Sequence, residues 1–271
     1  MSSTLSLRTM DLGVRFGSFD AVSGVNLCIE PGARQALIGP NGAGKTTLIN
    51  LLTGVISPTS GRVELNGQDI TRLRADQRVR AGLSRTFQIN TLFPRLTPLS
   101  SVVLAICERE GLGACWWKPV RSMRKIYDEA TAILGSLRLG DLANVPVIEM
   151  AYGKQRLLEI ALALATRPQI LLLDEPAAGV PAGESTELFE VIAGLPDDIS
   201  ILFIEHDMNL VFRFAQRISV LVAGRVFTEG SPETIANDPG VKEVYLGRKG
   251  SIAAKSGHGT ASASQGVALH G

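Results

Sequence analysis

The stretch GPNGAGKT, residues 39–46, decides the fold of this chain of 271 residues. It fits the pattern GxxxxGK[ST], which forms a phosphate-binding loop when a strand precedes it and a helix follows it. The mostly apolar residues Gln35–Ile38 predict that strand, and Thr46–Ile49 predicts the start of the helix. Glycines let backbone N–H groups approach phosphates closely, and the helix N-terminus adds a positive dipole. The stretch therefore predicts a strand, a glycine-rich loop and a helix that together bind phosphate groups.

The loop also carries the side chains that a nucleoside triphosphate with magnesium requires. Lys45 is expected to reach the β- and γ-phosphates, and the Thr46 hydroxyl is expected to coordinate Mg²⁺. We therefore predict ATP and Mg²⁺ as ligands. The residues expected to surround the nucleotide phosphates are Gly39, Pro40, Asn41, Gly42, Ala43, Gly44, Lys45, Thr46 and Thr47.

Two acidic residues after a second apolar run predict the hydrolytic part of the site. The run Ile170–Leu173 is followed by Asp174 and Glu175. At the carboxyl edge of a parallel sheet, Asp174 is placed to hold the metal. Glu175 is placed to act as general base on an attacking water.

A third apolar run, Ile201–Ile204, leads into Glu205, His206 and Asp207. His206 is the only histidine before residue 247, beyond which the other two lie. A single histidine is either structural or, at the end of a strand beside a nucleotide, a hydrogen-bond donor to the γ-phosphate. We predict the second role for His206.

The apolar runs also predict the fold class. Ile170–Leu173 and Ile201–Ile204 are continuous apolar runs, as expected for parallel strands covered on both faces, and Ile218–Val222 is a further strand. Helical patterns at Leu157–Thr166 and Glu184–Leu195 precede or separate these strands. This alternation predicts an α/β fold with a mainly parallel sheet.

Other segments depart from this alternation. Gly61–Leu65, followed by Asn66-Gly67, predicts a strand that enters a hairpin turn. From about Ile89 to Met150 the patterns are helical, as in Ser101–Glu108 and Val120–Leu137, which indicates a helical insertion in the sheet-based domain. Beyond Gly247 the chain is rich in Gly, Ala, Ser and Lys without apolar periodicity, so we expect a disordered tail.

Charge and hydropathy narrow the class of protein. The formal net charge is +1, which does not predict a nucleic-acid surface. The first ten residues lack the apolar core of a signal peptide, and no apolar run approaches the ~18 residues of a membrane span. We expect a cytosolic protein, or one that docks on a membrane through another protein.

Further motifs, in a fixed order, carry a family resemblance. Phe87-Gln88 precedes the helical insertion, and AYGKQR, residues 151–156, follows it shortly before Asp174 and Glu175. In this order the motifs resemble those of the nucleotide-binding subunits of ABC transporters, over Leu7–Gly247. The resemblance implies a P-loop NTPase fold with a RecA-like, mainly parallel sheet, an antiparallel β subdomain and a helical subdomain. It implies an ATPase domain over 1–248, with the helical subdomain at about 89–166, and a tail over 249–271.

The resemblance also implies roles for single residues. Phe16 matches the aromatic residue that stacks on adenine, although core packing is the alternative. Gln88 matches the glutamine that senses Mg²⁺ and the attacking water and contacts the transmembrane partner. Met150–Lys154 matches the signature loop, in which Ala151, Tyr152 and Gly153 would contact the nucleotide bound to the opposite subunit.

Two residues depart from the family pattern. Ala151 replaces the signature serine, so a hydroxyl contact to the γ-phosphate is missing and the Gly153 N–H must contribute more. Ala178–Pro181 matches the loop that pairs the two subunits, but its fourth residue is proline where Asp or Asn is frequent. We expect these changes to alter the rate or the symmetry of the two sites without abolishing hydrolysis.

A finer resemblance concerns the transported substrate. AYG at the signature, EPAAG after residue 174 and IEHDM at residues 204–208 are similar to the larger ATPase subunit of branched-chain amino-acid importers, with urea and amide importers close by. It implies a head-to-tail pair with a second ATPase subunit, favouring a heterodimer, and transmembrane permease subunits. The chain would lie peripherally on the cytoplasmic side of the inner membrane. The alternatives are a soluble ABC-type ATPase, an exporter subunit and a regulator that switches without turnover.

Two weaker features remain open. Five arginines form a basic stretch before Gln88: Arg72, Arg74, Arg78, Arg80 and Arg85. This stretch predicts a solvated helix face, with lipid or partner contact as the alternative. Trp116-Trp117 suits either partner docking or local packing.

Overall fold

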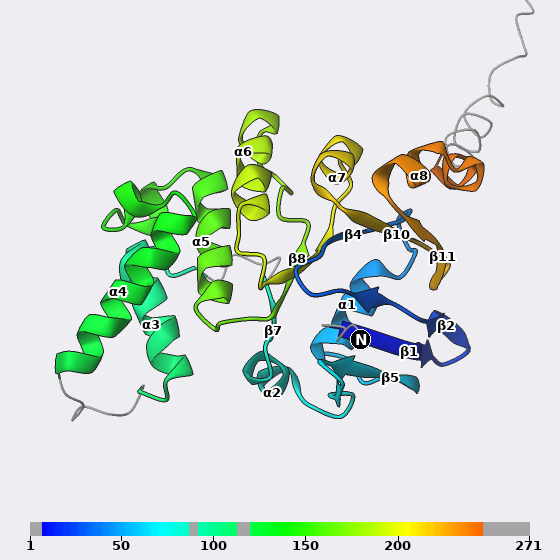
Figure 1. Ribbon diagram of the computed structural model, residues 1–271, viewed down its shortest axis with the longest axis horizontal. Coiled ribbons are helices and arrows are strands. Elements are labelled where there is room, and N and C mark those ends of the chain that lie inside the picture. The colour runs from blue at the N-terminus through cyan, green and yellow to red at the C-terminus, as the bar shows by residue number, and fades with distance from the viewer. Residues whose placement is uncertain (1–6, 87–91, 113–119, 246–271) are drawn as a thin grey trace, which may run out of the picture.

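The computed structural model describes residues 7–86, 92–112 and 120–245. Within them lie an antiparallel sheet, a mainly parallel sheet and a group of helices beside the parallel sheet (Figure 1). The strands are β1 (Leu7–Phe16), β2 (Phe19–Val25), β3 (Cys28–Ile29), β4 (Arg34–Ile38), β5 (Ser60–Leu65), β6 (Gln68–Asp69), β7 (Leu83–Arg85), β8 (Ile170–Asp174), β9 (Ser200–Ile204), β10 (Arg217–Val222) and β11 (Arg225–Gly230). The α-helices are α1 (Lys45–Thr53), α2 (Ala75–Arg80), α3 (Pro98–Arg109), α4 (Val120–Ser136), α5 (Tyr152–Leu164), α6 (Ala182–Ala193), α7 (Met208–Phe214) and α8 (Pro232–Asn237).

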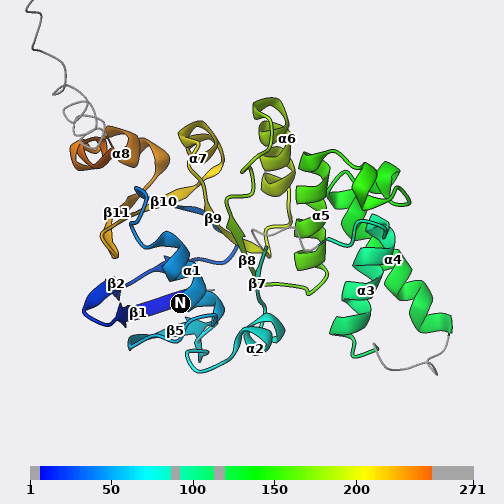
Figure 2. The same cartoon turned by 180° about the vertical axis from the view of Figure 1, so that it is seen from behind.

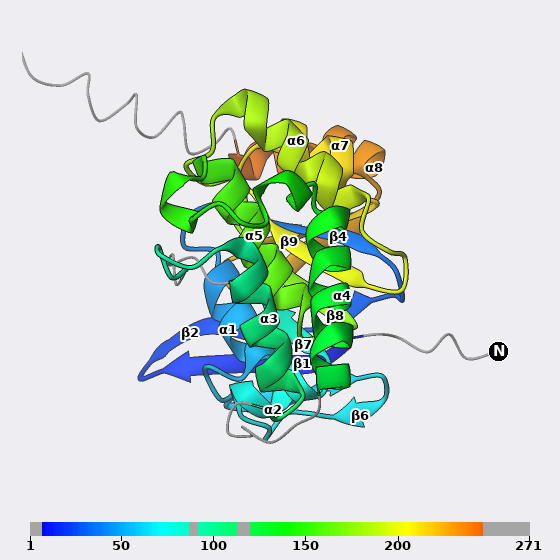
Figure 3. The same cartoon turned by 90° about the vertical axis from the view of Figure 1, so that its left-hand side faces the viewer.

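The larger sheet confirms the predicted mainly parallel α/β fold. Its strand order is β11-β10-β4-β9-β8-β7, and every pair is parallel except β10 with β11. Leu171 and Leu173 of β8 join the core on one face, whereas Ile170 and Leu172 join the core on the other. Helices α6, α7 and α8 lie along one face, and α1 lies on the opposite face (Figures 2 and 3). The central strands β8 and β9 are mostly apolar and buried because both of their faces are covered.

The smaller sheet has the order β2-β1-β5-β6, with β3 also paired to β1, and its pairs are antiparallel. The hairpin predicted at Asn66-Gly67 joins β5 to β6. Both turn residues have positive φ, 49° at Asn66 and 79° at Gly67. These angles are typical of a tight two-residue hairpin turn. This sheet packs on the α1 face of the parallel sheet through one shared apolar core.

The helical group contains α3, α4 and α5. The Thr97 hydroxyl caps α3 by accepting from the amide N–H of Ser100, and Pro98 occupies the first turn, where its missing N–H costs nothing. Glu129 of α4 accepts from the guanidinium groups of Arg109 at 2.7 Å and Arg167 at 2.8 Å, which joins α3, α4 and the loop after α5. Across the described parts of the chain, no helix combines the length and apolar character needed to cross a membrane.

The prediction of a solvated arginine face is wrong for Arg78. Its side chain is 1% exposed, and its guanidinium donates to the carbonyl oxygens of Leu51, Leu52, Leu73 and Thr71 at 2.6–3.0 Å. Burial lowers the pKa of Arg78 to about 10. The carbonyls of α1 at its C-terminus carry a partial negative charge, so a buried cation is stabilised there. Arg78 therefore fixes the end of the helix that begins at the phosphate loop.

Candidate functional site

The sheet order brings the predicted motifs to one edge. Strand β4 lies between β10 and β9, and β8 follows next to β9. Strand β4 continues into α1 on one face of the sheet, whereas its neighbour β9 continues into α7 on the other face. Ligands bind at such a switch point, beyond the carboxyl ends of the strands. Residues 39–44 follow β4, residues 175–181 follow β8 and residues 205–207 follow β9. Three loops far apart in the sequence thus meet at one place.

The phosphate loop is held closely against the sheet. Lys45 is 7% exposed, and its Nζ donates to the carbonyl oxygens of Gly39 at 2.7 Å and Pro40 at 3.2 Å. Burial lowers the pKa of Lys45. Gly44, which precedes α1, has φ 99°, and a Cβ there would lie 2.6 Å from the carbonyl oxygen of Ala21. Glycine is therefore required at position 44 for both its conformation and the space available.

One open pocket gathers most of the predicted site residues. Residues 41–47 of the phosphate loop and of α1 line it, together with Glu175, His206, Phe19 and Ala21. The first residues of α1 line this pocket, and the first N–H groups of a helix have no intrahelical partners, so they can bind an anion. A general base candidate and an imidazole line the same pocket as a phosphate-binding loop, which is the combination of groups that phosphoryl transfer to water requires.

Glu175 and His206 contact each other in this pocket. The Nε2 atom of His206 lies 2.7 Å from Oε1 of Glu175, and the imidazole is about half exposed, at 48%. Glu175 has φ 51°, a conformation that costs energy for a residue with a Cβ. Its amide donates to the carbonyl oxygen of Ile204 at 3.0 Å, which fixes that conformation. Strained backbone at this point is consistent with a functional residue.

Asp174 is buried beside the same site. It is 5% exposed, and Oδ2 accepts from Nη2 of Arg85 at 2.6 Å. Nη1 of Arg85 donates to Oδ1 of Asn50 at 2.7 Å, so Arg85 joins β7 to α1 and β8 and does not lie on a solvated face as predicted. Within the described ranges, no group of three or more His, Cys, Asp or Glu could hold a metal. The available donors, the Asp174 carboxylate and the Thr46 hydroxyl, are the hard oxygen ligands that Mg²⁺ prefers when phosphates complete its shell.

Ala151, Tyr152 and Gly153 lie apart from this pocket. Ala151 is exposed and precedes α5, and none of the three lines the pocket that contains Lys45. A Cβ on Gly179 would lie 3.3 Å from the ring of Tyr152, so this loop packs beside the segment after Glu175. The structure brings the loop of residues 151–153 to the loop of residues 178–181, and not to the phosphate loop of the same chain.

The aromatic residues near the phosphate loop include one that the sequence reasoning missed. Phe16 and Phe19 are paired at the end of the β1–β2 hairpin, and both are at least half exposed. Phe19 lines the pocket beside Asn41 and Gly42, whereas Phe16 does not. The repeated aromatic in FGSF, residues 16–19, was the available signal, because a tight turn places both rings at one edge. Gln88, like Trp116-Trp117, lies outside the described residues.

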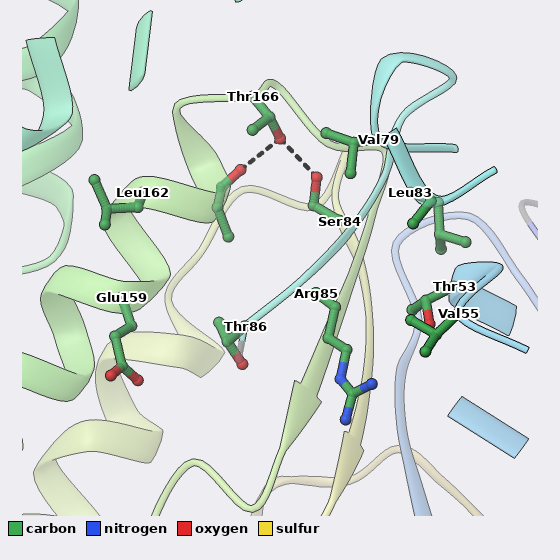
Figure 4. A pocket seen from close by; sticks show the side chains of 12 residues that line it. Thr53, Val55, Val79, Leu83, Ser84, Arg85, Thr86, Glu159, Leu162 and Thr166 are labelled. Carbon is green, nitrogen blue, oxygen red and sulfur yellow. Dashed lines mark hydrogen bonds between the residues drawn. The ribbon is translucent and has the colours of Figure 1, made fainter. Parts of the chain in front are cut away.

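A second pocket lies between α2, β7 and α5 (Figure 4). It is mostly apolar, with Val79, Leu83 and Leu162 among its lining residues. Arg85 and Glu159 also line it, from β7 and α5 respectively. Because Arg85 also bonds Asp174, its side chain links this pocket directly to the predicted nucleotide site.

Comparison with known proteins agrees with this arrangement. Residues 22–178 match the profile of the ABC transporter family, and residues 225–250 match that of the branched-chain amino acid ATP-binding cassette transporters. The branched-chain amino acid transport ATP-binding protein BraF of Pseudomonas aeruginosa is 40% identical over 248 residues, 89% of this chain and 97% of BraF. Its counterpart LivG of Escherichia coli is 42% identical over 243 residues, 87% of this chain and 95% of LivG.

A solved structure shares the fold. An ATP-binding cassette of an ABC transporter in its ADP conformation is 31% identical and superposes with a TM-score of 0.78, covering 90% of this chain and 99% of that chain. The matches extend over the phosphate loop, the parallel sheet and the helical group. The chain therefore belongs to the ABC transporter family, among the ATP-hydrolysing ATP-binding cassettes that include BraF and LivG.

Proposed function

We propose that this chain is the ATP-hydrolysing subunit of a membrane importer for branched-chain amino acids or related small amino acids and amides. The observation that carries the hydrolytic part is the single pocket that contains the phosphate loop, Glu175 and His206. The cargo class follows from the transport named for BraF and LivG and from the match of residues 225–250. No described residue contacts the cargo in this reading, because the subunit supplies free energy and not recognition.

The hydrolytic roles follow from charge and position. Lys45 would neutralise charge on the β- and γ-phosphates, because its Nζ, which bonds the carbonyl oxygens of Gly39 and Pro40, lies at the phosphate loop and can turn to the phosphates. Glu175 would accept a proton from the water that attacks the γ-phosphorus. His206, within hydrogen-bond distance of Glu175, would donate to the γ-phosphate and hold it in line with that water.

A magnesium ion would supply charge neutralisation between the β- and γ-phosphates. Thr46 and Asp174 are the described residues suited to hold it, and we also propose Gln88 for this role. The Arg85 guanidinium holds Oδ2 of Asp174, which leaves the other carboxylate oxygen for the metal shell. These oxygen donors are hard ligands, which suit Mg²⁺ better than a softer ion.

A second ATPase subunit would complete the site. Ala151 is exposed, and residues 151–153 do not line the pocket of the phosphate loop in their own chain, as expected if they meet the nucleotide on a partner. Two such subunits would close head-to-tail around two ATP molecules, and we favour a heterodimer. With Ala151 in place of a serine, the backbone N–H of Gly153 would make the main contact to the γ-phosphate.

Permease subunits would dock at the second pocket (Figure 4). The pocket is apolar, borders the helical group and includes Thr86, two residues before Gln88. A partner segment seated there would reach the metal carboxylate through Arg85. In this arrangement residues 1–248 form the ATPase domain, about 89–166 its helical subdomain, and 249–271 a tail. The chain would be held peripherally on the cytoplasmic side of the inner membrane.

Reconstitution tests the proposal. The chain is co-expressed with permease and sister ATPase subunits, purified as a complex and placed in liposomes with a substrate-binding protein and labelled leucine. We expect uptake that requires ATP and is lost in Glu175→Gln. ATP hydrolysis by a chain that never associates with membrane subunits would favour a soluble ABC-type ATPase, and outward transport would favour an exporter. ATP binding without turnover would favour a regulator.

A further inference from the structure

Glu205 is a buried carboxylate to which hydrolysis as described above assigns no role. It follows β9 directly and precedes His206, and it is 5% exposed. Burial raises the pKa of Glu205, because the charged form is poorly solvated there. A carboxylate in such a place is destabilising unless hydrogen bonds satisfy both of its oxygens. Its hydrogen-bond partners therefore indicate what it does.

The two oxygens of Glu205 bond two different loops. Oε1 accepts from the backbone N–H of Ala177 at 2.9 Å, and Ala177 lies two residues after Glu175. Oε2 accepts from the backbone N–H of His206 at 3.2 Å. One buried side chain thus spans the loop that carries Glu175 and the loop that carries His206.

We propose that Glu205 is a positioning residue for ATP hydrolysis, because it fixes the Glu175 loop against the His206 loop. The inference rests on the proposed roles of Glu175 and His206. Nε2 of His206 and Oε1 of Glu175 are 2.7 Å apart, and this contact depends on the relative position of the two loops. The amide of Glu175 also bonds the carbonyl oxygen of Ile204 at the end of β9, so Glu205 adds a second link between the two loops.

The position also joins hydrolysis to the subunit interface. Ala177 directly precedes residues 178–181, the loop proposed to meet the second ATPase subunit. The Ala177 amide is held by Glu205, and the ring of Tyr152 packs near Gly179 in the same loop. Movement of the loop of residues 178–181 would therefore displace the side chain of Glu205, and with it the backbone of His206. Glu205 is therefore placed to couple closure of the two ATPase subunits to the position of His206, which would contact the γ-phosphate.

A glutamine at position 205 tests this role with little change in shape. Glutamine has one carbonyl oxygen and one amide group, so it can accept from only one of the two N–H groups. Its NH₂ group would face the other N–H, a contact of two donors that costs about 1–3 kcal/mol when buried. Glu205→Gln should therefore release one loop while preserving the volume and the surrounding core.

The matched control is Glu129→Gln. Glu129 is, like Glu205, a carboxylate with two donors, here Arg109 and Arg167, but it is only partly buried and lies in the helical group away from both loops. Both substitutions remove one acceptor oxygen and a charge, so both should lower stability. Only Glu205→Gln should alter hydrolysis beyond what a loss of folded protein explains.

The experiment measures steady-state ATP hydrolysis, ATP affinity and backbone amide exchange on the full-length chain. For Glu205→Gln we expect kcat to fall about 10- to 100-fold, as a small misplacement of reacting groups does, with KM changed less than about threefold. Glu129→Gln should keep kcat within about twofold once scaled to the folded fraction. Equal kcat in wild type and Glu205→Gln would overturn the proposal.

Amide exchange keeps the test independent of turnover. The amides in peptides covering residues 175–181 and 204–207 should exchange at least about tenfold faster in Glu205→Gln, because a hydrogen bond is lost. Their exchange rates in Glu129→Gln should equal those of the wild type. If the wild type proves inactive, the proposed hydrolysis fails, whereas faster exchange alone would still support the bridge. Unchanged exchange in these peptides would contradict it. Should Glu205→Gln not fold, Glu205→Asp, whose shorter side chain cannot reach both loops, should show the same changes to a smaller extent.

Discussion

His206 and Glu175 are joined by a 2.7 Å contact between Nε2 and Oε1, although they follow different strands and are 31 residues apart. The contact exists because β8 and β9 are neighbours in the parallel sheet and end at the same edge. An imidazole that bonds the general base with one ring nitrogen has a second ring nitrogen that can face a γ-phosphate. In this site the general base Glu175 and the phosphate-binding residue His206 therefore hold each other in position.

Replacing the histidine should separate binding from turnover. In His206→Ala we expect ATP hydrolysis to fall about 100-fold or more, because both the γ-phosphate contact and the orientation of Glu175 are lost. ATP affinity should stay within about threefold, since the phosphate loop is unchanged. Phosphate release and fluorescent-nucleotide binding measure the two quantities. Turnover retained within about twofold would mean that the 2.7 Å contact is structural only.

Lys45 should control affinity for the nucleotide. Its ammonium group is buried and bonded only to backbone carbonyls of Gly39 and Pro40 among the contacts described, so it is poised to turn to phosphate oxygens. We expect Lys45→Ala to weaken ATP binding roughly 10- to 100-fold, the value of one charge-assisted hydrogen bond. Lys242→Ala, an exposed lysine elsewhere, is the control and should bind as wild type. Calorimetric titration with ATP measures the affinity of both variants. Equal affinity in the two would argue against the loop as the phosphate site.

The paired rings of Phe16 and Phe19 should contribute to base binding and not to phosphate binding. They pair at the end of the β1–β2 hairpin, and Phe19 lines the pocket beside the phosphate loop. Aromatic contacts are worth about 0.5–1.5 kcal/mol. We expect Phe16→Ala and Phe19→Ala each to weaken ATP binding about three- to tenfold, and to leave tripolyphosphate binding unchanged. Competition of both ligands against a fluorescent ATP analogue separates base from phosphate. An equal loss for tripolyphosphate would show that the hairpin acts on the loop itself.

The helical group should depend on the ionisation of Glu129. Hydrogen bonds from Arg109, and then from Arg167, lower the pKa of Glu129 below its usual value. A carboxyl group with a lowered folded-state pKa stabilises the fold above its unfolded pKa, and this stabilisation is lost as the pH falls through the folded pKa. At about pH 7, Glu129→Gln should therefore lower the free energy of unfolding by about 1–3 kcal/mol.

Urea unfolding at two pH values measures this effect. The difference between wild type and Glu129→Gln should shrink as the pH is lowered below about 4, because the wild-type carboxyl then becomes protonated. Glu190→Gln is a suitable control, since Glu190 forms a more exposed pair with Arg213. Its effect should stay below about 1 kcal/mol. A Glu129 effect that is independent of pH would show that packing, and not charge, is lost.

The parallel sheet could be predicted from the sequence because its strands carry their own signal. β8 and β9 are buried along their entire length, so their residues Ile170–Leu173 and Ile201–Ile204 form continuous apolar runs. The phosphate loop was equally clear, because few chains place that pattern between a strand and a helix. The antiparallel strands carry a weaker sequence signal, since β1 and β2 mix buried and exposed residues and their pairing has register shifts.

Other features depended on contacts that no local pattern encodes. Arg78 looks like part of a solvated basic face, yet carbonyls from α1 and from residues 71 and 73 bury it. Arg85 sits in the same basic stretch but reaches Asp174, 89 residues later in the chain. Glu205 was seen only as a neighbour of His206, because its partner Ala177 belongs to another loop. The contacts of such residues can be predicted only once the strand order is known.

The central claim is most directly tested by phosphate release from Mg-ATP, measured for the wild-type chain and for Glu175→Gln. The measurement is made on the purified chain and again with co-expressed membrane and sister ATPase subunits. We predict steady hydrolysis by the wild type, a fall of about 100-fold or more in Glu175→Gln and unchanged ATP affinity, since the carboxylate acts on water and not on ATP. Equal turnover in the two proteins, or a wild type that remains inactive even in the assembled complex, would contradict the account.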